Sequence, residues 1–435
     1  MKHIQQLAQM ARSLERQTAV CRQCGVCLAA CPIYPLTRLE KDTARGKIAV
    51  LEGVMADVVR NAESVRDRLD RCLLCGGCAG VCPNGVRTLE VFLKARVLLT
   101  EYLGLSPVKK MLFRRLLAKP ARFNRVADLA GGIQSLFLRD SGTRPETRRA
   151  RAFISPLLAG RHILPLAPVP FHRQPHGNLT PRHPARGETV LFFTGCLIDK
   201  IFPRVATASL QALKHHGYTI ILPETEGCCG IPALSAGDGV SFRRLLSHNL
   251  TQFGKTPFDR LVTACATCAF TIKKVWPMMV DGQDPQSARI REIAGKVTDI
   301  TGLIASRLTD GPPSPDAAAI PVTYHDPCHL KKSLGVFQAP RRLITANPNY
   351  KLVEMRGADA CCGMGGGFGL AHGGLSEEIG RAKLDHIIET GARMAATACP
   401  ACMIQLAGLL SKHGKADVRV CHPIEIYYAL ISTEP

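Results

Sequence analysis

The 435-residue chain is short of aromatic side chains and of long apolar runs, and each shortage excludes a class of protein. Aromatic residues make up 5% of the chain, so the interleaved stacking platforms that hold single-stranded nucleic acid are absent. No run of about 18 apolar residues occurs, which argues against a membrane-spanning helix. The opening sequence MKHIQQLAQMARSLERQ lacks the apolar segment of a secretory signal, so we expect a cytoplasmic protein.

Cysteine, by contrast, is abundant. Nineteen cysteines without a secretory signal indicate metal-binding or redox thiolates in a reducing compartment rather than a disulfide framework. Eight of them form two matching blocks, CRQCGVCLAACP at 21–32 and CLLCGGCAGVCP at 72–83. Each block has the spacing C-x-x-C-x-x-C-x-x-x-C-P, in which three thiolates hold one iron–sulfur cube and the fourth completes the other cube.

This spacing predicts two cubane [4Fe-4S] clusters. The first is assigned to Cys21, Cys24, Cys27 and Cys82, and the second to Cys72, Cys75, Cys78 and Cys31. A pair of structural zinc sites is the weaker alternative, because zinc usually takes two C-x-x-C pairs and needs no block of three.

The net charge is strongly positive. The chain has 56 Lys and Arg against 35 Asp and Glu, a formal charge of +21. Four bound clusters would lower this to roughly +12 to +14, because each carries about −2 with its thiolates. Residues 94–151 alone hold 14 basic and four acidic residues. An acidic protein subunit or the anionic inner face of a membrane explains this surface at least as well as nucleic acid does, and we expect no nucleic-acid partner.

The second half of the chain is an internal repeat with five cysteines in each copy. Cys196 precedes Cys328 by 132 residues, and the offsets of the adjacent pair and of the C-x-x-C motif are 133 and 134. The two sets are Cys196, Cys228, Cys229, Cys265 and Cys268, and Cys328, Cys361, Cys362, Cys399 and Cys402. Strand-like segments alternate with helical ones at 206–215, 242–253 and 377–390, which predicts α/β units with parallel strands.

Five cysteines suit a polynuclear centre better than a single ion. One tetrahedral zinc needs four ligands and leaves a fifth thiolate idle, and a disulfide between adjacent cysteines would be strained. Adjacent thiolates allow one sulfur to bridge two irons. An iron–sulfur centre is therefore favoured in each repeat, with zinc in one of the halves as the alternative.

These patterns resemble a known family. The early blocks resemble the helical ferredoxin domains of respiratory dehydrogenase subunits. The repeats resemble the cysteine-rich CCG domain found in heterodisulfide reductases and in glycolate and lactate oxidase iron–sulfur subunits. The order of the domains, and the segments YHDPCHLKKSLGV, CCGMGGGFGL and ATACPACMIQL, are similar to the glycolate oxidase iron–sulfur subunit. The resemblance implies that each five-cysteine set holds a non-cubane [4Fe-4S] cluster, with one or two such clusters in all and zinc possible in one repeat.

The fold expected is an α+β multidomain protein, in which an α-helical ferredoxin domain precedes two repeated α/β CCG domains. We place the ferredoxin-like domain at 1–100 and a basic helical segment followed by a Pro-rich linker at 101–187. The two CCG domains are placed at 188–310 and 318–435. Helix is expected over 89–138, from the end of the ferredoxin-like domain into the middle segment, with breaks near Pro107 and Pro120. An extended linker is expected over 161–186.

The resemblance also implies a partner: an FAD-binding subunit that oxidises a 2-hydroxy acid such as glycolate or lactate. No flavin or nicotinamide site is recognisable on this chain, and thiolates alone do not remove a hydride from an alcohol. We therefore expect an electron-transfer subunit that passes electrons from the flavoprotein to an acceptor such as quinone, with peripheral contact to the cell membrane and no substrate oxidation of its own.

Three other functions stay open on sequence grounds. They are heterodisulfide-reductase-like chemistry at a CCG cluster, the iron–sulfur subunit of an anaerobic glycerol-3-phosphate dehydrogenase, and a basic zinc protein that binds nucleic acid.

A few residues outside the cysteine sets also have chemistry that could serve a site. His325, His329 and His422 could ligate metal or relay protons, although packing or a hydrogen bond to a nearby loop is the favoured role for each. Cys421 has no partner in the repeat and is expected in the core. The glycine-rich loop 363–369 lacks the spacing of a dinucleotide loop, so we expect a tight loop around a cluster.

Overall fold

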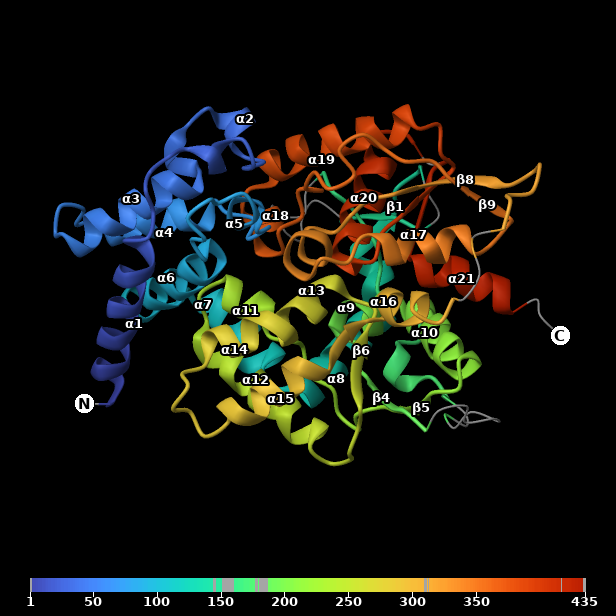
Figure 1. The fold of residues 1–435 in the computed structure, drawn as a ribbon, viewed down its shortest axis with the longest axis horizontal. Coiled ribbons are helices and arrows are strands. Elements are labelled where there is room, and N and C mark those ends of the chain that lie inside the picture. Colours follow the sequence, from blue (N-terminus) through green and yellow to red (C-terminus); the bar gives the residue numbers. More distant parts are fainter. Residues whose placement is uncertain are drawn as a thin grey trace.

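The computed structural model describes residues 2–143, 146–150, 160–176, 179, 187–308, 311, 313–415 and 417–432. An N-terminal helical lobe packs against one end of a pair of α/β lobes (Figure 1). No helix among these residues is both long and apolar enough to cross a membrane.

The helical lobe is built around α6 (Thr88–Leu103), which is buried on most of its circumference. The helices α1 (Lys2–Thr18) and α4 (Ala62–Asp70) pack against α6, and α3 (Ala44–Met55) packs against both of them. The shorter elements are η1 (Val26–Leu28), α2 (Tyr34–Thr37), η2 (Glu40–Asp42) and α5 (Gly77–Gly80). The two cysteine blocks lie in the loops and short helices between these long helices.

Each α/β lobe contains a four-stranded parallel sheet, and the two sheets have the same strand order. The first has the order β5-β4-β6-β7, made of β4 (Thr189–Phe192), β5 (Thr219–Ile221), β6 (Arg260–Thr263) and β7 (Val297–Asp299). The second has the equivalent order β9-β8-β10-β11, made of β8 (Ile320–Tyr324), β9 (Tyr350–Leu352), β10 (Met394–Ala396) and β11 (Arg419–Cys421). The predicted fold class, a helical domain followed by two parallel α/β repeats, is confirmed.

The helices around the sheets also correspond between the two lobes. The first lobe has α9 (Cys196–Lys200), α10 (Pro203–His215), α11 (Ile231–Ser235), α12 (Gly239–Phe253), α13 (Ala266–Phe270), η5 (Thr271–Val275), α14 (Trp276–Met279), α15 (Ser287–Lys296) and α16 (Ile300–Ala305). The second has η6 (His329–Ser333), α17 (Gln338–Thr345), α18 (Gly367–Ala371), α19 (Gly373–Glu389), α20 (Pro400–Lys412) and α21 (Pro423–Ile431).

The lobes pack on each other with approximate two-fold symmetry. Helix α10 of the first lobe contacts α21 of the second, and their counterparts α17 and α16 contact each other in turn. In the same way, α13 contacts η6, and their counterparts α20 and α9 contact each other. Because the cysteines follow the same strands in both lobes, this symmetry brings the two five-cysteine sets toward one interface.

The segment between the helical lobe and the first α/β lobe is partly as expected. Helices α7 (Pro107–Lys110), η3 (Met111–Leu117) and α8 (Pro120–Phe137) are interrupted before each proline, where the sequence predicted breaks. The described part of the predicted extended linker is irregular over most of its length but also has short regular elements. It contains β3 (His162–Ile163), which pairs with β2 (Arg148–Ala150) and through it with β1 (Leu138–Asp140), and η4 (Phe171–Arg173).

This small antiparallel sheet is held by side chains that give no periodic signal in the sequence. The ring nitrogen Nδ1 of His162 lies 2.7 Å from the hydroxyl of Ser411 on α20, and the ring of Phe171 is buried. Two- and three-residue strands are too short for an alternating pattern, so proline content alone suggested a linker. Residues 177–178 and 180–186 of that linker lie outside the described residues, as do residues 309–310 and 312 near the boundary between the two predicted CCG domains.

Candidate metal centres

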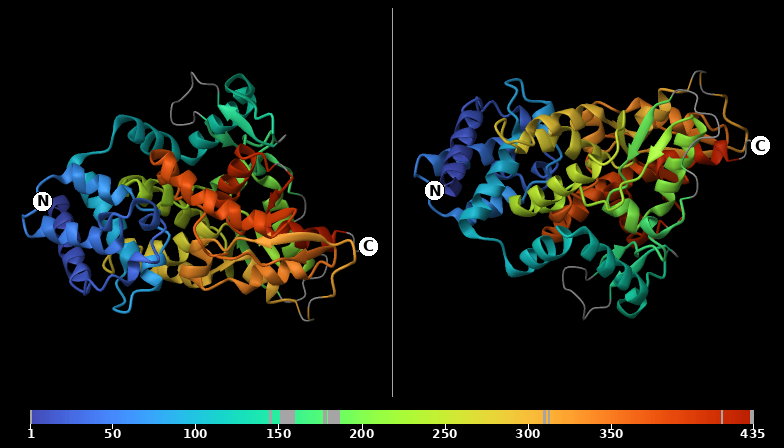
Figure 2. Two further views of the ribbon diagram at one scale, coloured as in Figure 1. Left: turned by 90° about the horizontal axis from the view of Figure 1, so that it is seen from above. Right: turned by 90° about the horizontal axis from the view of Figure 1, so that it is seen from below.

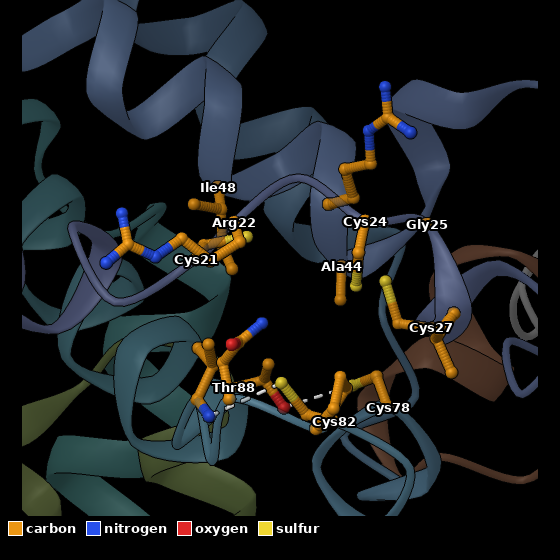
Figure 3. A pocket seen from close by; sticks show the side chains of 15 residues that line it. Cys21, Arg22, Cys24, Gly25, Cys27, Ala44, Ile48, Cys78, Cys82 and Thr88 are labelled. Atoms are coloured by element: carbon orange, nitrogen blue, oxygen red, sulfur yellow. Dashed lines mark hydrogen bonds between the residues drawn. The ribbon is translucent and has the colours of Figure 1, made fainter.

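The first predicted cubane group lines one cavity in the helical lobe. Cys21, Cys24 and Cys27 approach it from the loop after α1, and Cys82 approaches from the loop after α5 (Figure 3). Cys78, assigned to the second group, also reaches this cavity. The four thiols therefore come from two segments about 60 residues apart in sequence, as the motif requires.

The two cysteine loops repeat the same unusual backbone. Gln23 and Gly25 have positive φ angles of 54° and 82°, and the matching Leu74 and Gly76 have 54° and 74°. Left-handed conformations cost a non-glycine residue free energy, so they persist where the surroundings require them. The paired left-handed turns direct three thiols of each block toward one point.

The second predicted cubane group lines an adjacent cavity. Its four cysteines are Cys31, Cys72, Cys75 and Cys78. Since Cys78 borders both cavities, the two groups are immediate neighbours. The structure thus gathers each predicted group of four, while ligation itself stays a prediction.

The donor chemistry of both cavities fits an iron–sulfur cube. Burial raises the pKa of Cys75 to about 11, so an occupying cation is needed to hold this sulfur as a thiolate at neutral pH. Backbone N–H groups already point at sulfurs, from Leu74 to Cys72 at 3.5 Å and from Val86 to Cys82 at 3.4 Å. Such donors to ligand sulfurs are a means by which a protein tunes a cluster's potential.

A buried lysine, which the sequence pattern did not reveal, lines the second cavity. Lys47 on α3 is 1% exposed and its ammonium donates to the carbonyl of Asp42. Burial lowers the pKa of Lys47, while the neighbouring Cys72 and Cys31 act in the opposite direction. Its sequence signal is a lysine on the helix face shared by Ala44 and Ile48, a face that is typical of a core position.

The five cysteines of the first repeat gather at the carboxyl edge of its sheet. Cys196 begins α9 after β4, while Cys265 and Cys268 flank the start of α13 after β6. The Cys196 and Cys228 sulfurs are 3.7 Å apart. Carboxyl ends of parallel strands are where α/β sheets place their sites, so the fold explains why loops far apart in sequence meet here.

Buried polar groups shape the loop in front of Cys196. The Glu226 carboxylate accepts the backbone N–H groups of Thr194, at 2.8 Å, and of Gly195. Burial raises the pKa of Glu226 to about 8 in spite of these bonds. The indole N–H of Trp276 donates to the carbonyl of Cys229 at 3.0 Å, which fixes the adjacent pair from behind.

The second repeat gathers its five cysteines in the same way. Cys328 precedes η6 after β8, and Cys399 and Cys402 lie at the start of α20 after β10. The Cys362 and Cys402 sulfurs are 3.4 Å apart, and the N–H of Gly363 points at Cys361 at 3.4 Å. The glycine-rich loop therefore begins against a predicted ligand.

In both repeats the second cysteine of the adjacent pair accepts hydrogen bonds from other thiols of its set. Hydrogen bonds from the Cys228 and Cys268 thiols hold the pKa of Cys229 well below its usual range. Cys361 and Cys402 act in the same way on the pKa of Cys362. Several thiols of each set are therefore within hydrogen-bonding contact, which suits a cationic centre with several sulfur ligands.

The two repeat sites contact each other across the lobe interface. The thiol of Cys265 contacts that of Cys399, and the N–H of Ala266 donates to the carbonyl of Ala398 at 3.1 Å. The hydroxyl of Thr267 lies 3.5 Å from the Cys399 sulfur.

The second repeat also contacts the helical lobe. Cys328 and Cys361 pack with Cys75, in a small apolar cluster that includes Phe368. The ring of His329 lies 3.0 Å from the carbonyl of Leu74. The four cysteine groups therefore adjoin one another in a continuous row, in which the group of the second repeat lies between the two groups of the helical lobe and the group of the first repeat.

The remaining candidates have structural surroundings. His422 caps α21 by accepting the N–H of Ile424 at 3.1 Å, and Cys421 lies in the core. Asp326, which lies near Cys328 and was not among the candidates, pairs with the Arg341 guanidinium at 2.8 and 3.1 Å. His325 differs from these, because it groups with two cysteine sulfurs.

Comparison with known families matches these parts of the chain. Residues 20–87 match a 4Fe-4S dicluster domain, and residues 190–273 and 322–407 match a cysteine-rich domain. The probable glycolate oxidase iron-sulfur subunit of Bacillus subtilis is 27% identical over 414 residues, covering 92% of this chain and 91% of that protein. Lactate utilization protein A of a Geobacillus species is 30% identical over 239 residues, covering 54% of this chain and 98% of that protein.

A methanogen protein is also similar. It is one of the subunits of the dihydromethanophenazine:CoB--CoM heterodisulfide reductase of Methanosarcina barkeri. This protein is 26% identical over 411 residues, covering 89% of this chain and 88% of its own length.

Fold, cysteine sites and domain matches define an iron–sulfur protein with a dicluster domain and two cysteine-rich domains. The chain belongs to the family of iron–sulfur subunits that includes lactate utilization protein A and the glycolate oxidase iron-sulfur subunit. The resemblance stated from the sequence is thereby confirmed.

Proposed function

We propose that this chain is the electron-transfer subunit of a 2-hydroxyacid dehydrogenase complex acting on glycolate or lactate. An FAD-binding partner would oxidise the substrate, and this chain would pass the electrons toward an acceptor such as quinone. Bound iron–sulfur clusters supply one-electron chemistry at the cysteine sites. The observation that carries the proposal is the continuous row of four sites, because a row is what conduction requires and a single catalytic pocket does not.

The residues assigned to each site follow from the cysteine groups. Cubane clusters are proposed at Cys21, Cys24, Cys27 and Cys82, and at Cys31, Cys72, Cys75 and Cys78. Further centres are proposed at the five cysteines of each repeat, with a non-cubane cluster in at least one of them. The domains are proposed at 1–100, 101–187, 188–310 and 318–435.

The order of the sites is part of the proposal. Cys78 borders both cubane cavities, Cys75 packs with Cys361 of the second repeat, and Cys399 of that repeat contacts Cys265 of the first. Shared or touching ligands keep neighbouring centres close. Electrons would therefore travel between the helical lobe and the first repeat by way of the second repeat.

A serine substitution at Cys75 tests the conduction role. Cys75→Ser should abolish electron flow from substrate to acceptor in the assembled complex, while substrate still reduces the flavin of the partner. Cys421→Ser is the matched control, since it makes the same change at a buried cysteine outside the predicted sets and should leave electron flow intact. Loss of flavin reduction in an assembled Cys75→Ser complex would contradict the conduction role.

We also propose that the segment α7–α8 docks on an anionic lipid surface. Apolar side chains along one face of α8 point to solvent, with Leu129 65% and Leu136 64% exposed, and Met111 of η3 is 61% exposed. The opposite face is anchored, because Gln134 of α8 bonds the backbone of Leu166. The segment runs along the outside of the molecule (Figure 2).

Charge complementarity identifies the occupant of this face. Exposed basic residues lie beside the apolar ones, and they are Lys109, Lys110, Arg115, Lys119, Arg122 and Arg125. Helices with exposed Leu, Met and Val flanked by Lys and Arg bind in the interface of anionic membranes. Protein interfaces, by contrast, are depleted in lysine.

Vesicle sedimentation tests this face. The complex should sediment with vesicles of phosphatidylglycerol and phosphatidylcholine but not with phosphatidylcholine alone. The double change Leu129→Glu and Leu136→Glu should release it, whereas Val58→Glu, a control at an equally exposed apolar residue, should not. If the double variant sediments unchanged, or instead loses only its flavoprotein partner, the lipid assignment is wrong.

A further inference from the structure

The second repeat has a buried histidine where the first repeat has phenylalanine. His325 and Phe193 each lie three residues before the first cysteine of their repeat. The N–H of His325 donates to the carbonyl of Ala396 at 2.9 Å, and the N–H of Phe193 donates to that of Val262 at 2.8 Å. These bonds join matching strands, so the two side chains occupy equivalent places in the two lobes.

The His325 ring is fixed with one nitrogen toward the cysteines. The side chain is 1% exposed, and Nδ1 lies 3.2 Å from the carbonyl oxygen of Ala358. A carbonyl only accepts, so Nδ1 carries the proton and Nε2 presents a lone pair. Within the described part of the chain Nε2 has no hydrogen-bond partner of acceptable geometry, and a ring nitrogen of His325 lies within 4.8 Å of the sulfurs of Cys362 and Cys402.

The distances among these three groups are compatible with binding of one metal ion. A ring nitrogen of His325 and the sulfurs of Cys362 and Cys402 lie within 4.8 Å of one another, with 3.4 Å between the sulfurs. Two thiolates on one tetrahedral ion are about 3.8 Å apart, because metal–sulfur bonds are about 2.3 Å long. A histidine whose other ring nitrogen donates to a backbone carbonyl is the usual form of a metal-bound imidazole.

We propose that Nε2 of His325 is a ligand of the metal ion that Cys362 and Cys402 share. The second repeat then holds a centre with mixed nitrogen and sulfur ligation, while the first repeat, with Phe193 in that place, holds one with thiolate ligands alone. The inference rests on the proposed function in one respect, namely that the second repeat binds metal. Both zinc and the iron of a cluster can take imidazole as a ligand, and the experiment includes a separate measurement for each metal.

The test compares the full chain with three histidine variants, prepared anaerobically with iron, sulfide and zinc. If the ion is zinc, H325F loses the zinc and keeps its iron by elemental analysis. If the ion is iron, pulsed EPR of protein labelled with ¹⁵N-histidine shows an imidazole coupling that disappears in H325F. H325C, which supplies a thiolate instead, should retain the metal. H422F, which removes an equally buried imidazole in the same lobe, should keep both metals and the coupling.

The outcomes separate this inference from the proposed function. Unchanged zinc and iron in H325F, together with no imidazole coupling in the native protein, would overturn the ligand assignment. Cys402→Ser is measured in parallel. If it loses metal while H325F does not, only the histidine ligand fails. If Cys402→Ser also keeps its full metal content, the second repeat holds no metal centre. The proposed function then fails, because the row of four centres on which it rests is interrupted.

Discussion

The two cysteine-rich repeats share a strand order but differ in what surrounds their cysteines. In the first repeat Phe193 packs edge-on against Phe253 with 5.9 Å between ring centroids, and Trp276 closes the apolar wall behind the cysteines. In the second repeat His325 occupies the place of Phe193 and faces two sulfurs. The common fold brings five thiols together at the carboxyl edge of each sheet, and the side chains beside them differ between the two repeats.

The repeats also differ in position. The second repeat contacts the helical lobe through its cysteine site, with His329 bonded to Leu74. The first repeat contacts that lobe away from its cysteines, through the Arg96 guanidinium, which donates to the carbonyl of Ser235. Duplication thus supplied two similar sites, and docking of the helical lobe made one of them the intermediate site of the row.

The largest expected effect separates the intermediate site from the terminal one. Cys362→Ser should remove the magnetic interaction between the second cubane and the neighbouring centre of the second repeat. It should also lower the rate of electron transfer more than about 100-fold, because replacing residues that only hold metal ligands in place already lowers activity about 10–100-fold. Cys229→Ser, the matched change in the first repeat, should lower electron transfer but leave the EPR signal of the second cubane unaltered. Equal changes of that signal in both variants would show that the repeats are not arranged in series.

A second expected effect concerns the docking of the helical lobe. Arg96 is buried and donates to the carbonyls of Leu69, Cys72 and Ser235 at 2.5, 2.8 and 2.7 Å. Arg96→Ala should lower the free energy of unfolding by about 3–5 kcal/mol in urea titrations, because one buried and two partly buried carbonyls lose a charged donor. Arg60→Ala, at an exposed ion pair, should change it by less than about 1 kcal/mol. Similar losses in both variants would contradict the docking role of Arg96.

A third effect tests the loops before the first cysteines, where the first repeat has Gly195 and the second has Pro327. Gly195 has φ +76°, and an added Cβ would lie 3.1 Å from the Cys268 sulfur. Gly195→Ala should lower the free energy of unfolding by about 1–3 kcal/mol. Elemental analysis should show that metal is lost from the first repeat only. Gly335→Ala is the control, because it adds a Cβ in open space at φ +72°. It should lower the free energy of unfolding through backbone strain but leave the metal content unchanged. Full metal content in the Gly195 variant would show that the sulfur contact does not matter.

The smallest effect is a pH dependence at the lobe interface. A ring nitrogen of His216, the residue after α10, lies 2.8 Å from the hydroxyl of Tyr427 on α21, and burial lowers the pKa of His216 from 6.5 to about 4. In the unfolded chain the His216 imidazole becomes protonated below about pH 6.5, whereas in the folded chain it becomes protonated only near pH 4. The stability contributed by this group is therefore complete above pH 6.5 and is lost as the pH falls toward 4.

Solvent screening reduces the size of this pH effect to about 1–2 kcal/mol. His216→Gln should make the urea midpoint less sensitive to pH between 7.5 and 5 than that of the native protein. An unchanged pH sensitivity would mean that other groups control the interface.

The cysteine groups and the paired sheets were predictable from the sequence, because both leave regular spacings along the chain. Spacing within Cys21–Pro32 constrains where three thiols can point, and the regular offsets between repeats require one fold twice. The contact of Cys265 with Cys399 was not predictable, because it depends on how two lobes pack. Lys47 and Arg96 were missed for a related reason, since a basic residue on a helix is normally exposed.

The most direct test of the proposed electron path is EPR spectroscopy of the complex isolated anaerobically from its own cells. Spectra are recorded before and after addition of glycolate, D-lactate, L-lactate or glycerol-3-phosphate. We expect that glycolate or one of the lactates reduces the iron–sulfur signals through a flavoprotein that co-purifies. Signals that no 2-hydroxy acid reduces, but that a disulfide or thiol substrate perturbs, would contradict the proposed path.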